Sequence, residues 1–119
     1  MSDKKTEEKV ISILVVDPNK VFARSVKNVL ENNLINATAH IATNLWEVKR
    51  RLGENSYDLI LADLSVAMDS DDMLEEFEKR DVTVIKWSAI QVSSDSKLLR
   101  KPSTSTQLKD LVHSLPLPA

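Results

Sequence analysis

The sequence predicts a doubly wound α/β fold, in which one parallel sheet carries helices on both faces. Short apolar runs alternate along the chain with stretches whose apolar residues recur at helical spacing. The run Leu59–Ala62 is apolar at consecutive positions, as in a strand that is covered on both faces. A buried helix segment could show the same pattern, but the run is short and polar residues follow it at once. Asp63 ends the run, and open α/β sheets build their sites at the carboxyl ends of such strands.

Composition limits the classes of function. With 119 residues the chain is expected to form one domain that buries a core without disulfides or metal. The absence of cysteine excludes thiol redox chemistry and thiolate metal sites, and the single glycine, Gly53, excludes glycine-rich phosphate-binding loops. The net charge of −2, with both signs interspersed, predicts no nucleic-acid surface. No apolar run approaches the ~20 residues that span a bilayer.

The chain is expected to divide into a tail and one domain. Residues 1–9 are charged and lack the apolar region of a signal peptide, so they predict a disordered N-terminal segment. The domain is expected to cover residues 10–116. A cytoplasmic location follows from this interpretation.

Five strands are predicted, in the spatial order 2-1-3-4-5 by chain position. The second strand alternates apolar and polar residues, which is typical of a sheet edge. The fourth is rich in β-branched residues. The predicted strands are Ile11–Val16, Ile35–Ile41, Leu59–Ala62, Val82–Trp87 and Lys97–Arg100.

Four helices are predicted between and after these strands. The first has Asp17 as its N-cap and Pro18 at its first position, and continues to Asn32. The second begins after Thr43 or Asn44 and closes at Gly53. The third, short and acidic, covers about 70–80. The last starts at the cap Thr104, with Gln107 in the place of a capping-box residue, and stops at Pro116.

One connection is too short for a helix. Only Ala89–Ser96 separates the fourth and fifth strands, whereas a helical crossover needs ~10–12 residues. The helix between these strands is therefore expected to be shortened or missing. One face of the two strands would then be thinly covered, and the polar Lys86 and Arg100 within them fit such a face.

The predicted strand order brings acidic residues together. Strands one and three are neighbours at the point where the order reverses, so Asp17 and Asp63 are expected to converge. The ends of strands four and five add Ser88 and Lys101. Two carboxylates, a hydroxyl and an ammonium suit a hard cation such as Mg²⁺ together with a phosphoryl group. Two simpler roles stay open, because Asp17 could only cap a helix and Asp63 could only make a local turn bond.

These residues resemble the receiver domain of two-component response regulators, in an atypical form. The resemblance spans about Ile11–Leu115, and its markers are VVDPN (15–19), LILADLS (59–65), WSA (87–89) and RKPS (100–103). It implies a flavodoxin-like sheet, with Asp63 as the phosphoacceptor and Mg²⁺ as the cofactor. The implied metal ligands are Asp17, Asp63 and the backbone carbonyl of Ser65. Ser88 would be the switch hydroxyl, and Lys101 would pair with the phosphoryl group.

The resemblance also implies partners and a function. A histidine kinase or phosphotransfer protein would donate the phosphoryl group in a phosphorelay. A downstream protein or a second copy would bind through the strand 4/strand 5 face, and neither nucleic acid nor membrane is expected as a partner of this domain. The chain would not be an enzyme beyond self-catalysed transfer and autodephosphorylation.

Three departures from the family pattern support an alternative function. Pro18 stands where the family usually has a second acidic metal ligand, so Mg²⁺ binding is expected to be weak. Leu98 stands where an aromatic switch residue is common, and the crossover after the fourth strand is short. The alternative is a pseudo-receiver, an interaction module that signals without phosphorylation. A phosphatase or flavin carrier on the same fold is disfavoured, since no nucleophilic cysteine or hydroxyl-rich loop is present.

Overall fold

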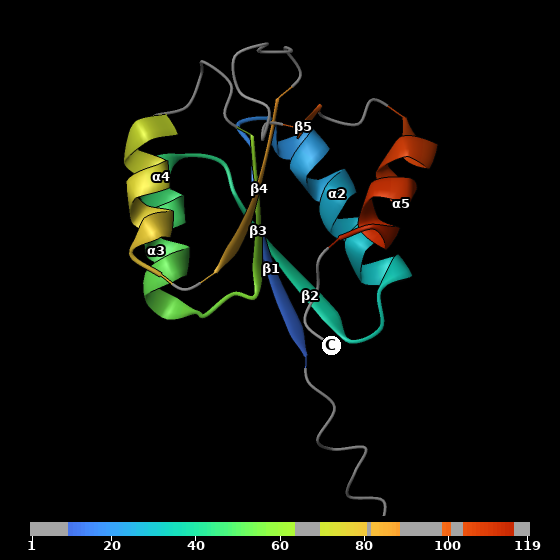
Figure 1. Cartoon of the computed structure of the whole chain (residues 1–119), viewed down its shortest axis with the longest axis horizontal. Coiled ribbons are helices and arrows are strands. Elements are labelled where there is room, and N and C mark those ends of the chain that lie inside the picture. The colour runs from blue at the N-terminus through green and yellow to red at the C-terminus, as the bar shows by residue number, and fades with distance from the viewer. Residues whose placement is uncertain (1–9, 64–69, 81, 89–98, 101–103, 116–119) are drawn as a thin grey trace, which may run out of the picture.

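The computed structural model shows a single parallel sheet between two pairs of helices, and it describes residues 10–63, 70–80, 82–88, 99–100 and 104–115 (Figure 1). The strand order is β2-β1-β3-β4-β5, so the predicted fold class is confirmed. The strands are β1 (Ile11–Val16), β2 (Ala37–Ala42), β3 (Leu59–Asp63), β4 (Thr83–Ser88) and β5 (Leu99–Arg100). The helices are α2 (Lys20–Asn33), α3 (Leu45–Glu54), α4 (Ser70–Glu78) and α5 (Ser105–His113). None of the helices in these ranges is long and apolar enough to cross a membrane.

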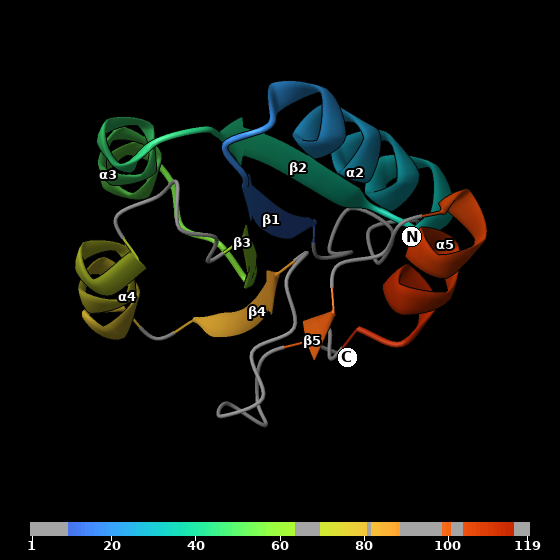
Figure 2. The ribbon, with the colours of Figure 1, turned by 90° about the horizontal axis from the view of Figure 1, so that it is seen from above.

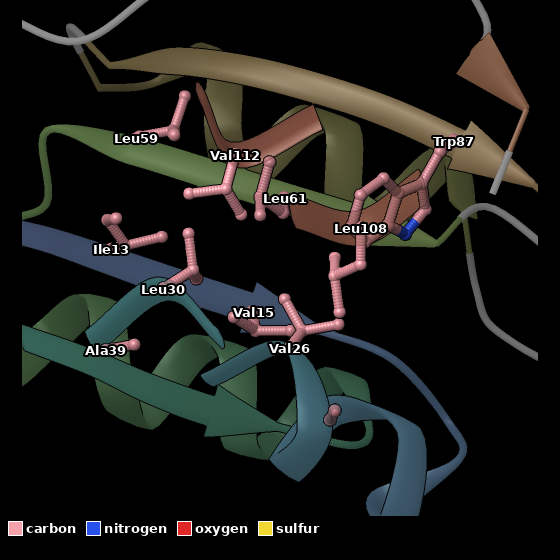
Figure 3. Close-up of a cluster of buried hydrophobic side chains, with 11 residues drawn as sticks. Ile13, Val15, Val26, Leu30, Ala39, Leu59, Leu61, Trp87, Leu108 and Val112 are labelled. Atoms are coloured by element: carbon pink, nitrogen blue, oxygen red, sulfur yellow. The ribbon is translucent and has the colours of Figure 1, made fainter. Parts of the chain in front are cut away.

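Each face of the sheet has its own core. Figure 2 shows α2 and α5 on one side of the sheet and α3 and α4 on the other. Strand β3 serves both cores and is buried at all five positions. Leu59 and Leu61 pack toward α2 and α5, with Leu30 and Val112 (Figure 3). The alternate β3 residues pack toward α3 and α4. A strand covered on both faces requires consecutive apolar residues, and this is the pattern that predicted it.

The edge strand is shorter at its start than predicted. Ala37, Ala39 and Ile41 pack toward the α2/α5 core as expected. Ile35, which was expected to begin the strand on the same side, is 83% exposed. The prediction for Ile35 was wrong because Asn36 has φ of 59°, a left-handed conformation that interrupts the extended chain.

Two predicted helix ends are corrected. Helix α2 is capped by Asn19, whose side chain accepts hydrogen bonds from the amides of Val21 and Phe22, and not by Asp17. Helix α3 ends at Glu54 with Asn55 as its C-cap, so Gly53 lies inside its last turn and does not close it. Without a positive φ at this position, the glycine is not needed for the helix end.

Two other caps follow the sequence. Asn44, one of the two candidates, caps α3 by accepting a hydrogen bond from the amide of Glu47 at 2.9 Å. Thr104 caps α5 as predicted, since its hydroxyl oxygen accepts from the amide of Gln107 at 3.1 Å. The predicted tail (1–9) and the predicted crossover (89–96) lie outside the described residues.

Candidate acidic site at the carboxyl edge of the sheet

Two aspartates lie at the carboxyl ends of neighbouring strands, Asp17 directly after β1 and Asp63 as the last residue of β3. Strands β1 and β3 are paired in parallel with Val16 opposite Ala62, so the next residue on each strand is an aspartate. Adjacent strands lie about 4.8 Å apart, which brings the two aspartates side by side. Asp17 is fully buried and Asp63 is 3% exposed. Burying two carboxylates next to each other is costly unless a cation or hydrogen-bond donors offset their charge.

Hydrogen bonds fix the position of Asp17. Its amide donates to the carbonyl of Ala42 on β2 at 3.0 Å, so its backbone still follows the sheet ladder. One carboxylate oxygen, Oδ1, accepts from the amide of Asn19 at 2.8 Å. This is a local Asx-type turn between the strand and α2. The interpretation of Asp17 as the helix cap is therefore wrong, because Asn19 fills that role.

Asp63 lies beside an aromatic pair. Its partner in the register of β3 and β4 is Trp87. The Trp87 ring is fully buried and meets Phe22 edge to face, with 6.2 Å between ring centroids and 74° between planes. Phe22 belongs to the first turn of α2, directly after the turn that holds Asp17. The strand partner of Asp63 thus belongs to a buried aromatic pair, and apolar surroundings strengthen electrostatic interactions.

The remaining predicted site residues are placed only in part. Ser88 is the last residue of β4, and its backbone pairs with Arg100 at the end of β5. Ser65 and Lys101 lie outside the described residues. Among the described parts of the chain, no group of three or more His, Cys, Asp or Glu residues could hold a metal ion. The described portion of the site therefore consists of Asp17, Asp63 and the nearby aromatic pair of Phe22 and Trp87.

The donor set fits a hard divalent cation. Carboxylate oxygens are the protein ligands that Mg²⁺ prefers, and Mg²⁺ usually keeps several waters, so two carboxylates are sufficient for a weak site. Pro18 is exposed and contributes no side-chain oxygen next to Asp17. The cap Asn19 was not predicted, although an Asn before an apolar-periodic stretch is a cap signal.

Solved structures of other proteins share this fold. No protein-family model matches the chain, and no curated protein matches it. The signal receiver domain of a DNA-binding response regulator from Colwellia psychrerythraea 34H matches with a TM-score of 0.69 and 23% identity, over 87% of this chain and 95% of that one. A response regulator from Thermotoga maritima matches with a TM-score of 0.65 and 23% identity, over 88% and 96%. The Mn²⁺-bound form of response regulator Rcp1 matches with a TM-score of 0.69 and 20% identity, over 92% and 99%.

The predicted resemblance is confirmed at the level of the fold. The chain has the fold of response-regulator receiver domains over most of its length. At identities below 25% the likeness carries no residue roles, because the same fold supports different functions.

Proposed function

We propose that this chain is a receiver that accepts a phosphoryl group on Asp63. The observation that carries the proposal is the placement of two buried aspartates on adjacent strand ends of a receiver-type fold. This edge is where open α/β sheets bind their ligands. The donor would be the phosphohistidine of a histidine kinase or of a phosphotransfer protein, and the location would be cytoplasmic.

The transfer exchanges one phosphorus bond for another. A carboxylate oxygen of Asp63 forms a P–O bond while the P–N bond to the donor imidazole breaks. The imidazole keeps the electron pair and takes up a proton, and Asp63 becomes an acyl phosphate. Attack by water on phosphorus later restores the carboxylate and releases phosphate. The chain would then need no enzymatic activity beyond this self-catalysed transfer and autodephosphorylation.

The neighbouring groups have distinct roles in this proposal. Asp17, Asp63 and the backbone carbonyl of Ser65 would hold Mg²⁺, which when bound offsets the negative charge that two carboxylates and a phosphoryl group bring together. A solved response regulator of the same fold is a Mn²⁺-bound form, which is consistent with a divalent cation here. Lys101 would pair with phosphoryl oxygens, and Ser88 would donate a hydrogen bond to one of them.

Incubation with acetyl phosphate and Mg²⁺, read by intact mass, tests the proposal. We expect one added phosphoryl group on the wild-type chain and none on Asp63→Asn. Asp72→Asn is a matched control, because Asp72 is an exposed acid on α4 that the proposal does not use. Absence of an adduct, or an adduct that persists in Asp63→Asn, would refute the proposal.

A second candidate is a pseudo-receiver that binds a protein through the β4/β5 side of the sheet. Its support is a groove of about 280 Å³ beside β4, whose floor includes Val84 and Lys86. Leu74 and Phe77 of α4 form its apolar wall. A downstream protein or a second copy would occupy it.

A Mg²⁺ titration separates the two candidates. In a Trp46→Phe background Trp87 is the only tryptophan, so its fluorescence reports on the surroundings of Asp63. Saturation in the low-millimolar range or below favours the phosphoryl acceptor. No saturation, combined with a concentration-dependent dimer that Lys86→Glu dissociates in sedimentation experiments, favours the pseudo-receiver.

A further inference from the structure

The indole N–H of Trp87 is a buried donor without an acceptor. Trp87 is fully buried, and its Nε1 atom has no hydrogen-bond partner among the residues that the structure describes. The indole nitrogen can only donate. Leaving such a donor unsatisfied destabilises the folded chain, and native proteins pair nearly all of their buried polar groups. An orphan donor in a buried aromatic ring therefore calls for an acceptor that is not part of the described chain.

The residue that carries this donor is the strand partner of the proposed phosphoacceptor. Trp87 is opposite Asp63 in the register of β3 and β4, one strand away. Leu61 and Trp87 pack in the same core, toward α2 and α5, and the alternation of side chains along β3 places Asp63 on that same side. Lys86 has the opposite parity on β4, so it belongs to the other face.

The ring of Trp87 lies on the α2/α5 side of the sheet. In Figure 3 it extends from the end of β4 into the core, with its six-membered ring near Leu108 and its nitrogen on the side of the ring away from β4. The edge-to-face contact with Phe22 holds the ring from the α2 side. Phe22 donates its amide to the Asn19 cap, and Asn19 donates its own amide to Asp17. The Trp87 ring is thus in contact with a residue, Phe22, that is hydrogen-bonded to the turn containing Asp17.

We propose that the Trp87 indole N–H donates a hydrogen bond to an anion carried on Asp63, a phosphoryl group in the reaction proposed above. This inference rests on the proposed function and adds a residue to it. A phosphoryl group brings charged acceptor oxygens, and hydrogen bonds to charged acceptors are shorter and stronger than neutral ones. The donor that is unsatisfied in the unmodified chain would then stabilise the phosphorylated one. Trp87 would be a binding residue for the phosphoryl group and not a ligand of the metal.

Nuclear magnetic resonance of the two indole N–H groups provides the test. The probe is beryllium fluoride with Mg²⁺, which forms a tetrahedral mimic of a phosphoryl group on a carboxylate. We expect the indole proton of Trp87 to move downfield and to show an Overhauser effect with the bound fluorine nuclei. The indole of Trp46 is the internal reference, because Trp46 is 69% exposed on α3 and should not change.

The outcomes separate this inference from the proposed function. A bound-fluorine signal that forms without any Overhauser effect to the Trp87 indole proton would overturn the inference while the proposed function stands. No bound-fluorine signal at all would refute both. Trp87→Phe removes the donor and keeps an aromatic ring, so we expect beryllium fluoride to bind about tenfold more weakly. Trp46→Phe is the matched control and should bind it like the wild-type chain, and equal affinity in both variants would also overturn the inference.

Discussion

At the scale of single residues, the candidate site depends on where β1 stops being a strand. Asp17 and Asn19 are both good helix caps by residue type, and sequence alone does not rank them. The amide of Asp17 still bonds to Ala42 on β2, and the first helical hydrogen bond runs from the amide of Ala23 to the carbonyl of Asn19, so α2 begins after Asn19. The bond to Ala42 leaves Asp17 at the end of a strand, beside Asp63, which is the position that a metal or phosphoryl site requires.

Pro18 limits the proposed metal site, and replacing it tests this directly. The affinity of oxygen-ligand sites rises with the number of charged ligands. Pro18→Asp adds a carboxylate next to Asp17 at an exposed position, so we expect Mg²⁺ to bind about tenfold more tightly, as measured by calorimetry. Pro18→Ala removes the proline without adding a ligand and should bind Mg²⁺ like the wild-type chain. Equal affinity of the Asp and Ala variants would argue against a metal site at this edge.

At the level of helices and strands, the hydrophobic pattern of the sequence predicted which segments are helices and which are strands. It did not predict the residues at which they begin and end. The run Leu59–Ala62 identified β3 because a doubly covered strand must be apolar at every position. Ile35 fitted the alternation of β2 but is exposed, because the left-handed Asn36 intervenes. Such turns depend on the backbone of one residue, which hydrophobic periodicity does not report. The same holds for the candidate site. The position of Asp63 at the end of its strand was predictable from the apolar run before it, whereas the unpaired indole N–H of Trp87 was not predictable from the sequence.

The start of α3 shows how an element end is stabilised. Glu47 accepts hydrogen bonds from both the amide and the hydroxyl of Thr43, at 2.7 and 2.8 Å. The amide of Glu47 in turn donates to the cap Asn44. This reciprocal arrangement is a variant of the capping box. The bonds from Thr43 lower the pKa of the Glu47 carboxyl below its usual value.

Glu47→Gln should therefore destabilise the fold in a pH-dependent way. A carboxyl with a lowered folded-state pKa contributes stability above its unfolded pKa and loses it as the pH falls through the folded pKa. We expect a loss of about 1 kcal/mol at pH 7 that disappears well below pH 4.5. Urea denaturation at several pH values measures it. Glu54→Gln on the same helix is the control, because its ion pair with Arg50 is exposed and should contribute little. A loss that persists at low pH would contradict the assignment.

In the molecule as a whole, the central strands join the two cores. Strands β1 and β3 each contribute alternate side chains to the α2/α5 core and to the α3/α4 core. The molecule should therefore unfold as one unit, with both cores lost in the same transition. The order of the sheet was predictable from the alternation of strands and helices, because short parallel crossovers allow few arrangements.

Leu61→Ala tests whether the two cores unfold together. Leu61 is fully buried on β3, so its truncation should cost about 3–4 kcal/mol, a large part of the roughly 5–15 kcal/mol that stabilise a domain. In the Trp46→Phe background, urea unfolding followed by Trp87 fluorescence and by circular dichroism should give coincident transitions at a lower midpoint. Val21→Ala is the control, because Val21 is 77% exposed. Transitions that separate in Leu61→Ala would show that the cores unfold independently.

Locating the phosphoryl group on the chain shows whether Asp63 is the residue that accepts it. After reaction with acetyl phosphate and Mg²⁺, borohydride converts an acyl phosphate into the corresponding alcohol, which marks the modified residue for peptide mass spectrometry. We expect Asp63, and not Asp17 or Asp58, to carry the mark. A mark on another residue, or none after a reaction that modifies a known receiver domain under the same conditions, would refute phosphoryl acceptance on Asp63.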